Sequence, residues 1–485
     1  MATALPRIDA TFTLGDLARA TGATLHGPPE LRIEGVSTDS RMIHPGSLFI
    51  ALKGERFDGH DHVAAAVKAG ARAVLTMRGR HTVTETPALE VSDPLVALGD
   101  IARFHGERVR AVSHARVAAI GGAVGKTTTK ELCAAAFRAA FGETHATRGN
   151  LNNLVGAPLT LLGLDESHRA AVIECGTNAP GEIARIGDVV RPDVALVLNA
   201  HLTHAEGLGS VEGVTREEGS LFAFASRAVV TGFNERGLRA EMERAPRDCA
   251  RWYFGTATGS HVRVLGAESA GLARYRVTFE VAPTLCEGAG RLVVESALLG
   301  ADMWDNIAAA LCVTAAAGAT ADGLRAAAEA MGKVEAVPGR LALRTLGRDV
   351  WVLDDTYNAS PHAVHSALAA ARMFAGGRSA RARLVVALGD MLELGDLSAS
   401  AHAEAGEEVA RARPAVFIAV GDGMRRAAWA AGATGRCGEV RTARDSTEAA
   451  VMLRELVRPG DLVLVKGSRG MRMERCVEAL VEAWP

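Results

Sequence analysis

The feature that most limits the fold of this chain is a glycine loop between an apolar run and a helix-like stretch. Residues 116–120 read as a buried strand, residues 122–127 form the loop Gly-Ala-Val-Gly-Lys-Thr, and residues 128–141 are typical of a helix. Glycines let backbone N–H groups turn inward on phosphate oxygens, and the helix N-terminus adds partial positive charge. This order predicts a site for a phosphate chain at the edge of an α/β sheet.

Two side chains of the loop suit nucleotide chemistry. Lys126 can reach the β- and γ-phosphates of a nucleotide, and the Thr127 hydroxyl can join a Mg²⁺ shell. Ile120 stands where the full G-x-x-x-x-G-K-T pattern has its first glycine. The alternative is a structural turn, but the strand before and the helix after favour nucleotide binding. The expected nucleotide contacts are Gly122, Ala123, Val124, Gly125, Lys126, Thr127 and Thr128.

The length of 485 residues predicts about three domains of roughly 150 residues each. We expect divisions at residues 1–112, 113–337 and 338–485. The hydrophobic content of 48% allows each domain a core, which must be built mainly from Ala, Val and Leu because aromatic residues make up only 4%. A formal net charge of −2 gives no electrostatic case for binding nucleic acid or an anionic membrane.

The seven cysteines are scattered and include no C-x-x-C pair, so we expect reduced residues and neither a disulfide framework nor a zinc site. The N-terminal stretch lacks a signal-peptide pattern, and no apolar run is long enough to span a bilayer. These observations predict a cytoplasmic protein without membrane insertion, and we expect a monomer.

The apolar runs predict an α/β architecture in every unit. The first unit has a short helix near residues 12–22, capped near Thr13, and a polar loop at 53–61 that is either a solvated turn or a ligand loop. The second alternates strands with helices, which predicts a mostly parallel sheet with helices on both faces. Its strands are expected at 170–174, 194–199 and 228–231, with antiparallel-type edge strands at 274–281 and 291–298.

The third unit has the outline of a Rossmann-like domain. Four short apolar runs, at 351–353, 384–388, 416–420 and 462–465, each end in polar or glycine residues. In such sheets, ligands bind beyond the carboxyl ends of the strands. The polar stretches 354–361, 389–395 and 466–469 therefore cluster at one predicted edge, although Asp and Ser near 354–361 would also serve as helix caps.

In the second unit, Glu174 closes an apolar strand, where a carboxylate is unfavourable unless it is paired or bound to a metal. The functional interpretation is a Mg²⁺ ligand near the phosphate loop, and the alternative is a carboxylate satisfied by backbone N–H groups. His201 and His204 follow the next strand, and a neutral imidazole can ligate a metal.

Taken together, these motifs resemble those of the Mur ligases, the ATP-dependent amide ligases that build the peptide of peptidoglycan. The resemblance covers nearly the whole chain. It rests on Asp39-Ser40-Arg41, Asp58-Gly59-His60-Asp61, Gly125-Lys126-Thr127, Asn150-Leu151-Asn152-Asn153, Glu174-x-Gly176, Pro338-Gly339-Arg340, Asp355-x-Tyr357-Asn358-Ala359, Gly389-Asp390-Met391 and Lys466-Gly467-Ser468-Arg469.

The resemblance implies three domains: an N-terminal α/β domain for a UDP-sugar substrate, a central P-loop ATPase domain and a C-terminal Rossmann-like ligase domain. The motifs of the second and third units favour the member that joins D-alanyl-D-alanine to a UDP-N-acetylmuramoyl tripeptide, with ATP and Mg²⁺, through an acyl phosphate. A related ligase with another amino-acid or dipeptide substrate and a non-catalytic nucleotide-binding homologue are the alternatives.

The resemblance also implies roles for individual residues. Those expected to carry catalysis are Lys126, Glu174, His204 and Arg340. Further ATP contacts are expected from Asn306, Arg340, Asp355 and Tyr357. Substrate contacts are expected from Ser40, Arg41, Lys53, Asn150, Asn152, Asn358 and Arg469. Expected metal ligands are Thr127, Glu174, His204 and Glu218.

Glu218 departs from the family pattern, because family members often carry a carbamylated lysine there that helps to hold a second Mg²⁺. A glutamate ends in a similar pair of hard oxygens and needs no CO₂. The alternative is that residues 216–218, a charged Arg-Glu-Glu run, form an exposed helix face.

Overall fold

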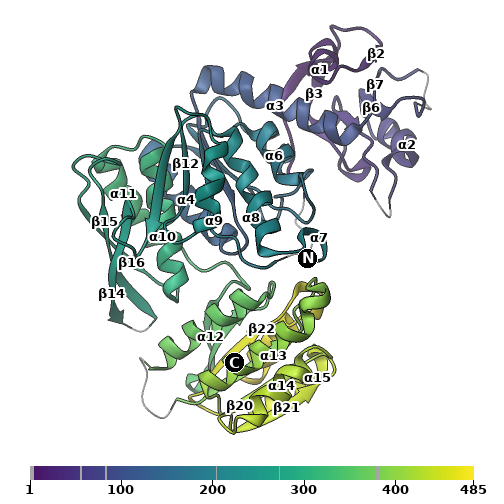
Figure 1. Ribbon diagram of the computed structural model, residues 1–485. Helices are drawn as coiled ribbons and strands as arrows, with labels where there is room; N and C mark the ends of the chain where they lie inside the picture. The colour runs from purple at the N-terminus through teal and green to yellow at the C-terminus, as the bar shows by residue number, and fades with distance from the viewer. Residues whose placement is uncertain (1–4, 55–56, 82–84, 204, 272, 377–381) are drawn as a thin grey trace.

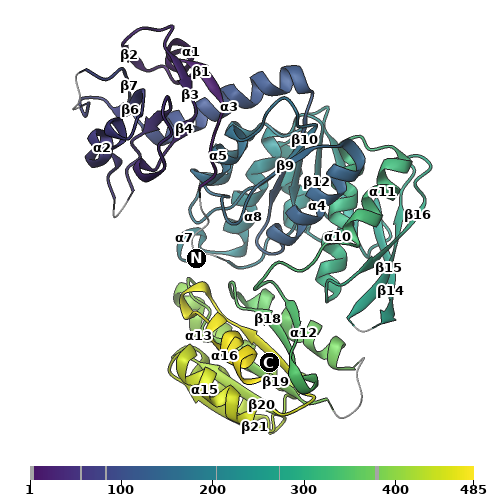
Figure 2. The same ribbon diagram turned by 180° about the vertical axis from the view of Figure 1, so that it is seen from behind.

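The computed structural model of the protein describes residues 5–54, 57–81, 85–203, 205–271, 273–376 and 382–485. Three units follow one another along the chain, and the central unit lies between the other two (Figures 1 and 2). Each unit is built around its own β-sheet, as the α/β fold class predicts. No helix in the described ranges is long and apolar enough to cross a membrane.

The N-terminal unit contains a five-stranded sheet of mixed direction. Its strands lie in the order β2 (Thr24–His26), β7 (Ala88–Val91), β6 (Ala73–Met77), β5 (Leu48–Ile50) and β4 (Val36–Ser37), and only β2 is antiparallel to its neighbour. Helix α1 (Leu14–Thr21) begins after Thr13, whose hydroxyl accepts the Asp16 N–H, so the predicted cap is confirmed.

Helix α3 (Pro94–Ser113) connects the N-terminal unit to the central one (Figure 1). Its buried side chains Leu98 and Ile101 belong to one continuous core that includes Leu14 of α1 and Leu161 and Ile186 of the central unit. The two units therefore share apolar packing along α3.

The central unit contains a nine-stranded sheet. Its order is β16 (Arg291–Ser296), β15 (Arg274–Val281), β14 (Val262–Gly271), β13 (Ala250–Gly255), β12 (Ala228–Gly232), β11 (Val194–Val197), β8 (Arg116–Gly121), β10 (Ala170–Glu174) and β9 (Thr144–Ala146). Pairing is parallel from β9 to β14 and antiparallel from β14 to β16. The predicted parallel sheet with an antiparallel edge is confirmed.

Strand β8 shows why both faces of this sheet are covered. Val117 and Ala119 point into the core that includes α3, α5 (Gly156–Leu162) and α6 (Glu182–Val190). Ala118 and Ile120, which point the opposite way in a strand, join the core with α4 (Lys126–Phe141), α10 (Ala301–Ala316) and α11 (Ala321–Met331).

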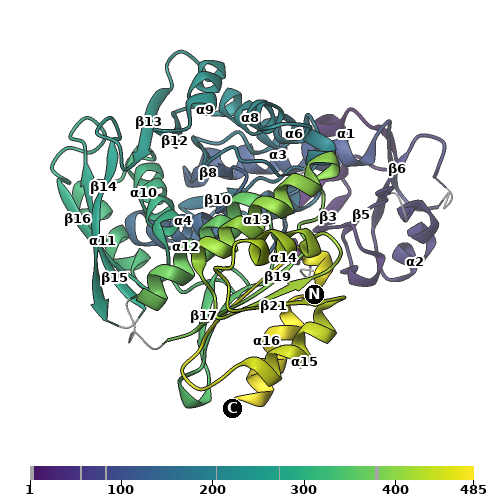
Figure 3. The same cartoon turned by 60° about the horizontal axis from the view of Figure 1, so that its bottom comes forward.

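The C-terminal unit is a six-stranded sheet in the order β17 (Ala342–Thr345), β18 (Trp351–Asp355), β22 (Leu462–Lys466), β19 (Leu384–Gly389), β20 (Val416–Val420) and β21 (Glu439–Ala443). All neighbours are parallel except β17. Helices α12 (Pro361–Gly376) and α13 (Ser398–Ala412) lie towards the central unit, and α15 (Ser446–Leu456) and α16 (Glu474–Ala483) cover the other face (Figure 3).

Candidate nucleotide-binding site

The predicted phosphate loop lies directly between β8 and α4. Gly122 and Gly125 have φ angles of 124° and 91°, a region that side chains rarely adopt. A Cβ on Gly125 would lie 2.9 Å from Asn306 Oδ1, so the side chain of Asn306 lies against the loop. The loop and the predicted contact Asn306 are therefore adjacent.

Asn199 holds this loop and was not predicted as a site residue. Its Oδ1 accepts the Val124 N–H at 2.9 Å, its Nδ2 donates to the Val124 carbonyl at 2.9 Å, and its own carbonyl accepts the Ala123 N–H at 3.0 Å. The only signal in the sequence is an amide at the end of an apolar run.

Lys126 and Glu218 meet beneath the loop. Lys126 Nζ donates to the Gly122 carbonyl and lies 3.9 Å from Glu218 Oε1. Glu218 Oε2 accepts the Gly122 N–H at 2.7 Å, and burial raises the pKa of Glu218 while Lys126 and this N–H act in the opposite direction. Glu217 and Glu218 are both buried, so the alternative of an exposed face is wrong for these two residues; only Arg216 of the run is exposed.

Glu174 closes β10 beside the first turn of α4. Its Oε1 accepts the Thr127 hydroxyl at 3.3 Å and the Asn152 amide at 2.8 Å. Its Oε2 is buried and has no hydrogen-bond partner among the described residues. A carboxylate oxygen left in this state beside a threonine hydroxyl is chemically suited to a hard cation.

A complete metal cluster is not formed by the described part of the chain, which contains no group of three or more His, Cys, Asp or Glu side chains that could hold an ion. His204, the expected ligand following β11, lies outside the described residues.

The C-terminal unit brings Arg340 to the loop. Arg340 Nη2 lies 3.5 Å from Thr127 Oγ1, and its guanidinium carbon lies 3.9 Å from the centroid of the Tyr357 ring. Arg340 Nε is buried without a hydrogen-bond partner among the described residues. Arg469 approaches the same ring from further away, at 5.9 Å.

Asp355 is fixed from two sides. Its Oδ1 accepts the Leu341 N–H at 3.1 Å, and its Oδ2 accepts from Lys466 Nζ at 2.6 Å. Lys466 also donates to the carbonyl of Asn358 at 2.9 Å. The stretches 354–361 and 466–469, predicted to share an edge, are therefore in direct contact. The motif Lys466-Gly467-Ser468-Arg469 by itself predicts no individual role for Lys466.

The expected substrate residues divide between the units. Asn152 lies at the central site through its bond to Glu174, whereas Asn150 is exposed two residues earlier. Ser40, Arg41 and Lys53 belong to the N-terminal unit. Arg41 is exposed and forms an ion pair with Asp39 at 2.6 Å. Lys53 is also exposed, and its backbone forms an isolated antiparallel β-bridge with Asp58.

A second contact joins the central and C-terminal units. The rings of His201 and His362 stack with centroids 3.6 Å apart, and His362 Nε2 lies 3.3 Å from Asp302. Burial, with a smaller contribution from His362, lowers the pKa of His201 to about 4, so its imidazole is neutral at neutral pH.

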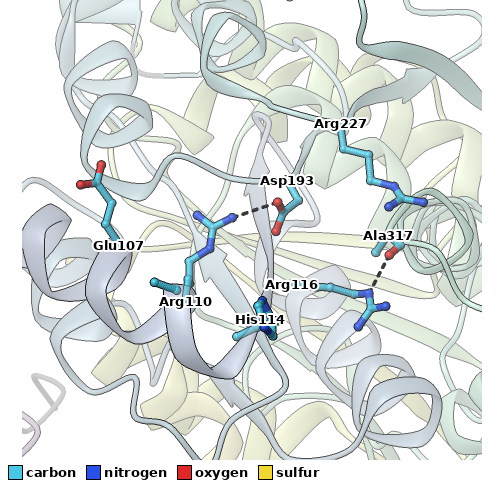
Figure 4. Close-up of a pocket in the computed structure, with 9 residues that line it drawn as sticks. Glu107, Arg110, His114, Arg116, Asp193, Arg227 and Ala317 are labelled. Carbon is cyan, nitrogen blue, oxygen red and sulfur yellow. Dashed lines mark hydrogen bonds and ion pairs between the residues drawn. The ribbon is translucent and has the colours of Figure 1, made fainter.

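A hollow of about 560 Å³ lies at the other end of the central sheet (Figure 4). Arg110 Nη2 donates to Asp193 at 2.9 Å. Arg227 Nε donates to the carbonyl of Ala316, the last residue of α10, and Arg116 Nε donates to that of Ala317, the C-cap. Since Arg116 begins β8 and the phosphate loop follows the end of β8, this hollow is separate from the loop. Arg116 and Arg227 cap the C-terminal end of α10.

The fold and the site define a class: proteins of three α/β units with a phosphate loop in the central one. Three stretches of the chain match known families. Residues 32–111 match the Mur ligase family catalytic domain, residues 120–314 match the Mur ligase middle domain, and residues 339–469 match the Mur ligase glutamate ligase domain.

Full-length relatives agree. The chain is 34% identical to the UDP-N-acetylmuramoyl-tripeptide–D-alanyl-D-alanine ligase of Escherichia coli (strain K12), covering 97% of this chain and 99% of the relative. It is 30% identical to the enzyme of the same name from Bacillus subtilis (strain 168), covering 97% and 98%.

Solved structures give the same result. MurF from Acinetobacter baumannii superposes with a TM-score of 0.85 at 27% identity, covering 99% of this chain and all of the other. MurF from Thermotoga maritima in complex with ADP superposes with a TM-score of 0.78 at 27% identity, covering 92% of this chain and 97% of the other. The chain belongs to the Mur ligase family.

Proposed function

We propose that the protein is the ATP-dependent ligase that joins D-alanyl-D-alanine to a UDP-N-acetylmuramoyl tripeptide in peptidoglycan precursor synthesis. The observation that carries the proposal is the meeting of the phosphate loop, the Glu174–Thr127 pair and Arg340 at one place between two units. Full-length similarity to ligases of that name supports the choice of substrates.

In this proposal the nucleotide lies between the central and C-terminal units. Backbone N–H groups of residues 122–128 and the Lys126 ammonium bind its phosphates. Asn306 contacts the adenine from its place against Gly125. Arg340, held on Tyr357, places a second positive charge beside Thr127, and its buried Nε, which has no partner among the described residues, is a further donor. Asp355, fixed by Lys466, contacts the nucleotide from the C-terminal unit.

The residues present fit Mg²⁺ bound partly by substrate. Mg²⁺ typically takes one or two protein oxygens and completes its shell with water and phosphates. Two such oxygens are Thr127 Oγ1 and Glu174 Oε2, the latter without a hydrogen-bond partner in the described part of the chain, and His204 and Glu218 are the further expected ligands. When bound, the ion would neutralise part of the negative charge of the phosphates.

The reaction has two steps. A carboxylate oxygen of the tripeptide bonds to the γ-phosphorus while the bond from that phosphorus to the bridging oxygen breaks, which releases ADP. The amine of D-alanyl-D-alanine then bonds to the acyl carbon, and the amine loses a proton. The bond between the acyl carbon and the phosphate oxygen breaks, which releases inorganic phosphate. Lys126 and Arg340 stabilise the developing negative charge.

The acceptor substrate extends from this centre towards the N-terminal unit. Ser40, Arg41 and Lys53 bind the UDP-sugar, Asn150 and Asn152 face the peptide, and Asn358 and Arg469 contact substrate from the C-terminal unit. We further propose a cytoplasmic monomer. All seven cysteines are free, which is consistent with a reducing compartment.

A phosphate-release assay tests the proposal. The purified protein is given ATP and Mg²⁺ with each combination of UDP-muramoyl dipeptide or tripeptide and free amino acid or D-alanyl-D-alanine. Release is expected only with the tripeptide and D-alanyl-D-alanine together. Release with the dipeptide and a free amino acid would instead assign the chain to a sibling activity of the family.

A further inference from the structure

Helix α8 (Val211–Gly219) ends in two adjacent buried carboxylates. The exposed fractions of Glu217 and Glu218 are 7% and 2%. A helix C-terminus carries partial negative charge, which disfavours carboxylates in the last turn, and burial of an unpaired carboxylate is also unfavourable. Both residues are therefore expected to have strong hydrogen-bond donors from other elements.

Glu218 finds its donors in the phosphate loop. Its Oε2 accepts the Gly122 N–H at 2.7 Å, and its Oε1 lies 3.9 Å from Lys126 Nζ. A Cβ on Gly121 would lie 2.9 Å from Glu218 Oε2, so this approach depends on glycine at that position. One carboxylate thus fixes both the backbone of the loop and its lysine.

Glu217 finds its donors in a different loop, the one that follows Glu174. Its two oxygens accept the N–H groups of Gly181 at 2.7 Å and Ile183 at 2.8 Å, and the Thr177 hydroxyl lies 3.4 Å away. Gly181 is the N-cap of α6 and has no side chain to cap the helix, so Glu217 supplies the cap from α8.

Consecutive residues of a helix point about 100° apart, so the end of one helix can bond to two loops. We propose that Glu217 and Glu218 are paired positioning residues that fix the loop carrying Lys126 relative to the loop following Glu174. Three of their four carboxylate oxygens accept backbone N–H groups, and the fourth, Glu218 Oε1, faces the Lys126 ammonium. The inference rests on the proposed function, because the purpose it gives to holding Lys126 and Glu174 in fixed positions is to align ATP with its metal ion.

The experiment compares four variants: Glu218→Gln, Glu218→Ala, Glu217→Gln and, as a matched control, Glu212→Gln, which changes an exposed residue of the same helix. ADP affinity is measured by calorimetry, kcat and KM by phosphate release, and folding by thermal unfolding. Glutamine at 218 keeps an acceptor for Gly122 and loses the charge that faces Lys126, whereas alanine loses both.

We expect Glu218→Ala to weaken ADP binding about tenfold and Glu218→Gln to restore most of that affinity while kcat stays about tenfold low. Glu217→Gln should leave ADP affinity unchanged, lower kcat and raise the Mg²⁺ concentration needed for half-maximal rate. Glu212→Gln should match wild type in every measurement.

Two results would overturn the inference. One is wild-type ADP affinity in both Glu218 variants, and the other is wild-type kcat and Mg²⁺ dependence in Glu217→Gln. If wild-type protein releases no phosphate with the tripeptide and D-alanyl-D-alanine, the proposed function fails, and the ADP measurements on the Glu218 variants still decide the role of Glu218.

Discussion

The guanidinium of Arg340 stacks on the ring of Tyr357, with 3.9 Å between the guanidinium carbon and the ring centroid. The same guanidinium reaches to 3.5 Å from the Thr127 hydroxyl in the phosphate loop. Tyr357 therefore holds a positive charge from the C-terminal unit against the first turn of α4 in the central unit. Closing the two units around a nucleotide would use this contact.

Replacement of Arg340 by lysine should lower kcat/KM about tenfold to a hundredfold. Lysine keeps the positive charge, but it lacks the planar fork that stacks on an aromatic ring and donates to two oxygens at once. Steady-state phosphate release measures the effect. Arg425→Lys, on the surface of α14 (Met424–Ala433), is the control and should retain full activity. Equal activity of the two variants would contradict the role of Arg340.

Removal of the Lys126 side chain should reduce turnover on the order of a hundredfold or more, because the loop loses its positioned cation beside a developing anion. The matched control is Lys333→Ala, which changes an exposed lysine just after α11 that pairs with Glu329. Turnover of Lys126→Ala at the wild-type rate would reject the phosphate-loop assignment.

Glu174→Gln tests the proposed metal ligand. The amide is nearly the same size and retains an oxygen for the Thr127 hydroxyl or the Asn152 amide, but it lacks the negative charge that attracts Mg²⁺. We expect the half-maximal Mg²⁺ concentration to rise about tenfold, with partial recovery of rate at high Mg²⁺. A Mg²⁺ titration that superposes on that of wild type would show that Glu174 is not a ligand.

Acid should weaken the contact between the central and C-terminal units at His201. Its pKa falls from an ordinary value of 6.5 to about 4 in the folded protein, mainly through burial. Between these values the unfolded chain binds a proton that folded His201 does not, so stability is lost as the pH falls through this window. Asp305, whose pKa burial raises to about 6, acts with the opposite sign.

His201→Phe isolates this contribution, because phenylalanine keeps a ring against His362 and cannot be protonated. Thermal unfolding at about pH 7.5 and about pH 5 should show a smaller acid destabilisation in the variant, by about 1 kcal/mol after allowance for the partial exposure of His201. An identical pH response in variant and wild type would contradict the account.

Apolar runs made most of the fold predictable. Strands β8, β10, β11 and β12 are continuous apolar segments, as expected for a sheet covered on both faces. Strand β21 was not predicted, because its Glu439–Ala443 segment lies at the edge of the sheet, is only partly buried and carries polar side chains. Strand β17 lies at the opposite edge, and its partly exposed residues likewise form no continuous apolar run.

Site residues with a local motif were predictable, and those defined by tertiary contacts were not. Lys126 and Thr127 belong to a recognisable loop. The local signals of Asn199 and Glu217 are not specific, because an amide after a strand and a glutamate in a charged run are common on surfaces. Only the packing of β11 and α8 against neighbouring loops shows their hydrogen bonds.

The most direct test of the central claim is the mass of the product. The protein is incubated with ATP, Mg²⁺, UDP-N-acetylmuramoyl tripeptide and D-alanyl-D-alanine, and the nucleotide-sugar fraction is analysed by mass spectrometry. The account predicts a UDP-N-acetylmuramoyl pentapeptide, heavier than the tripeptide by D-alanyl-D-alanine less one water, formed in step with ADP. ADP formation without a pentapeptide, or no change in the tripeptide, would contradict it.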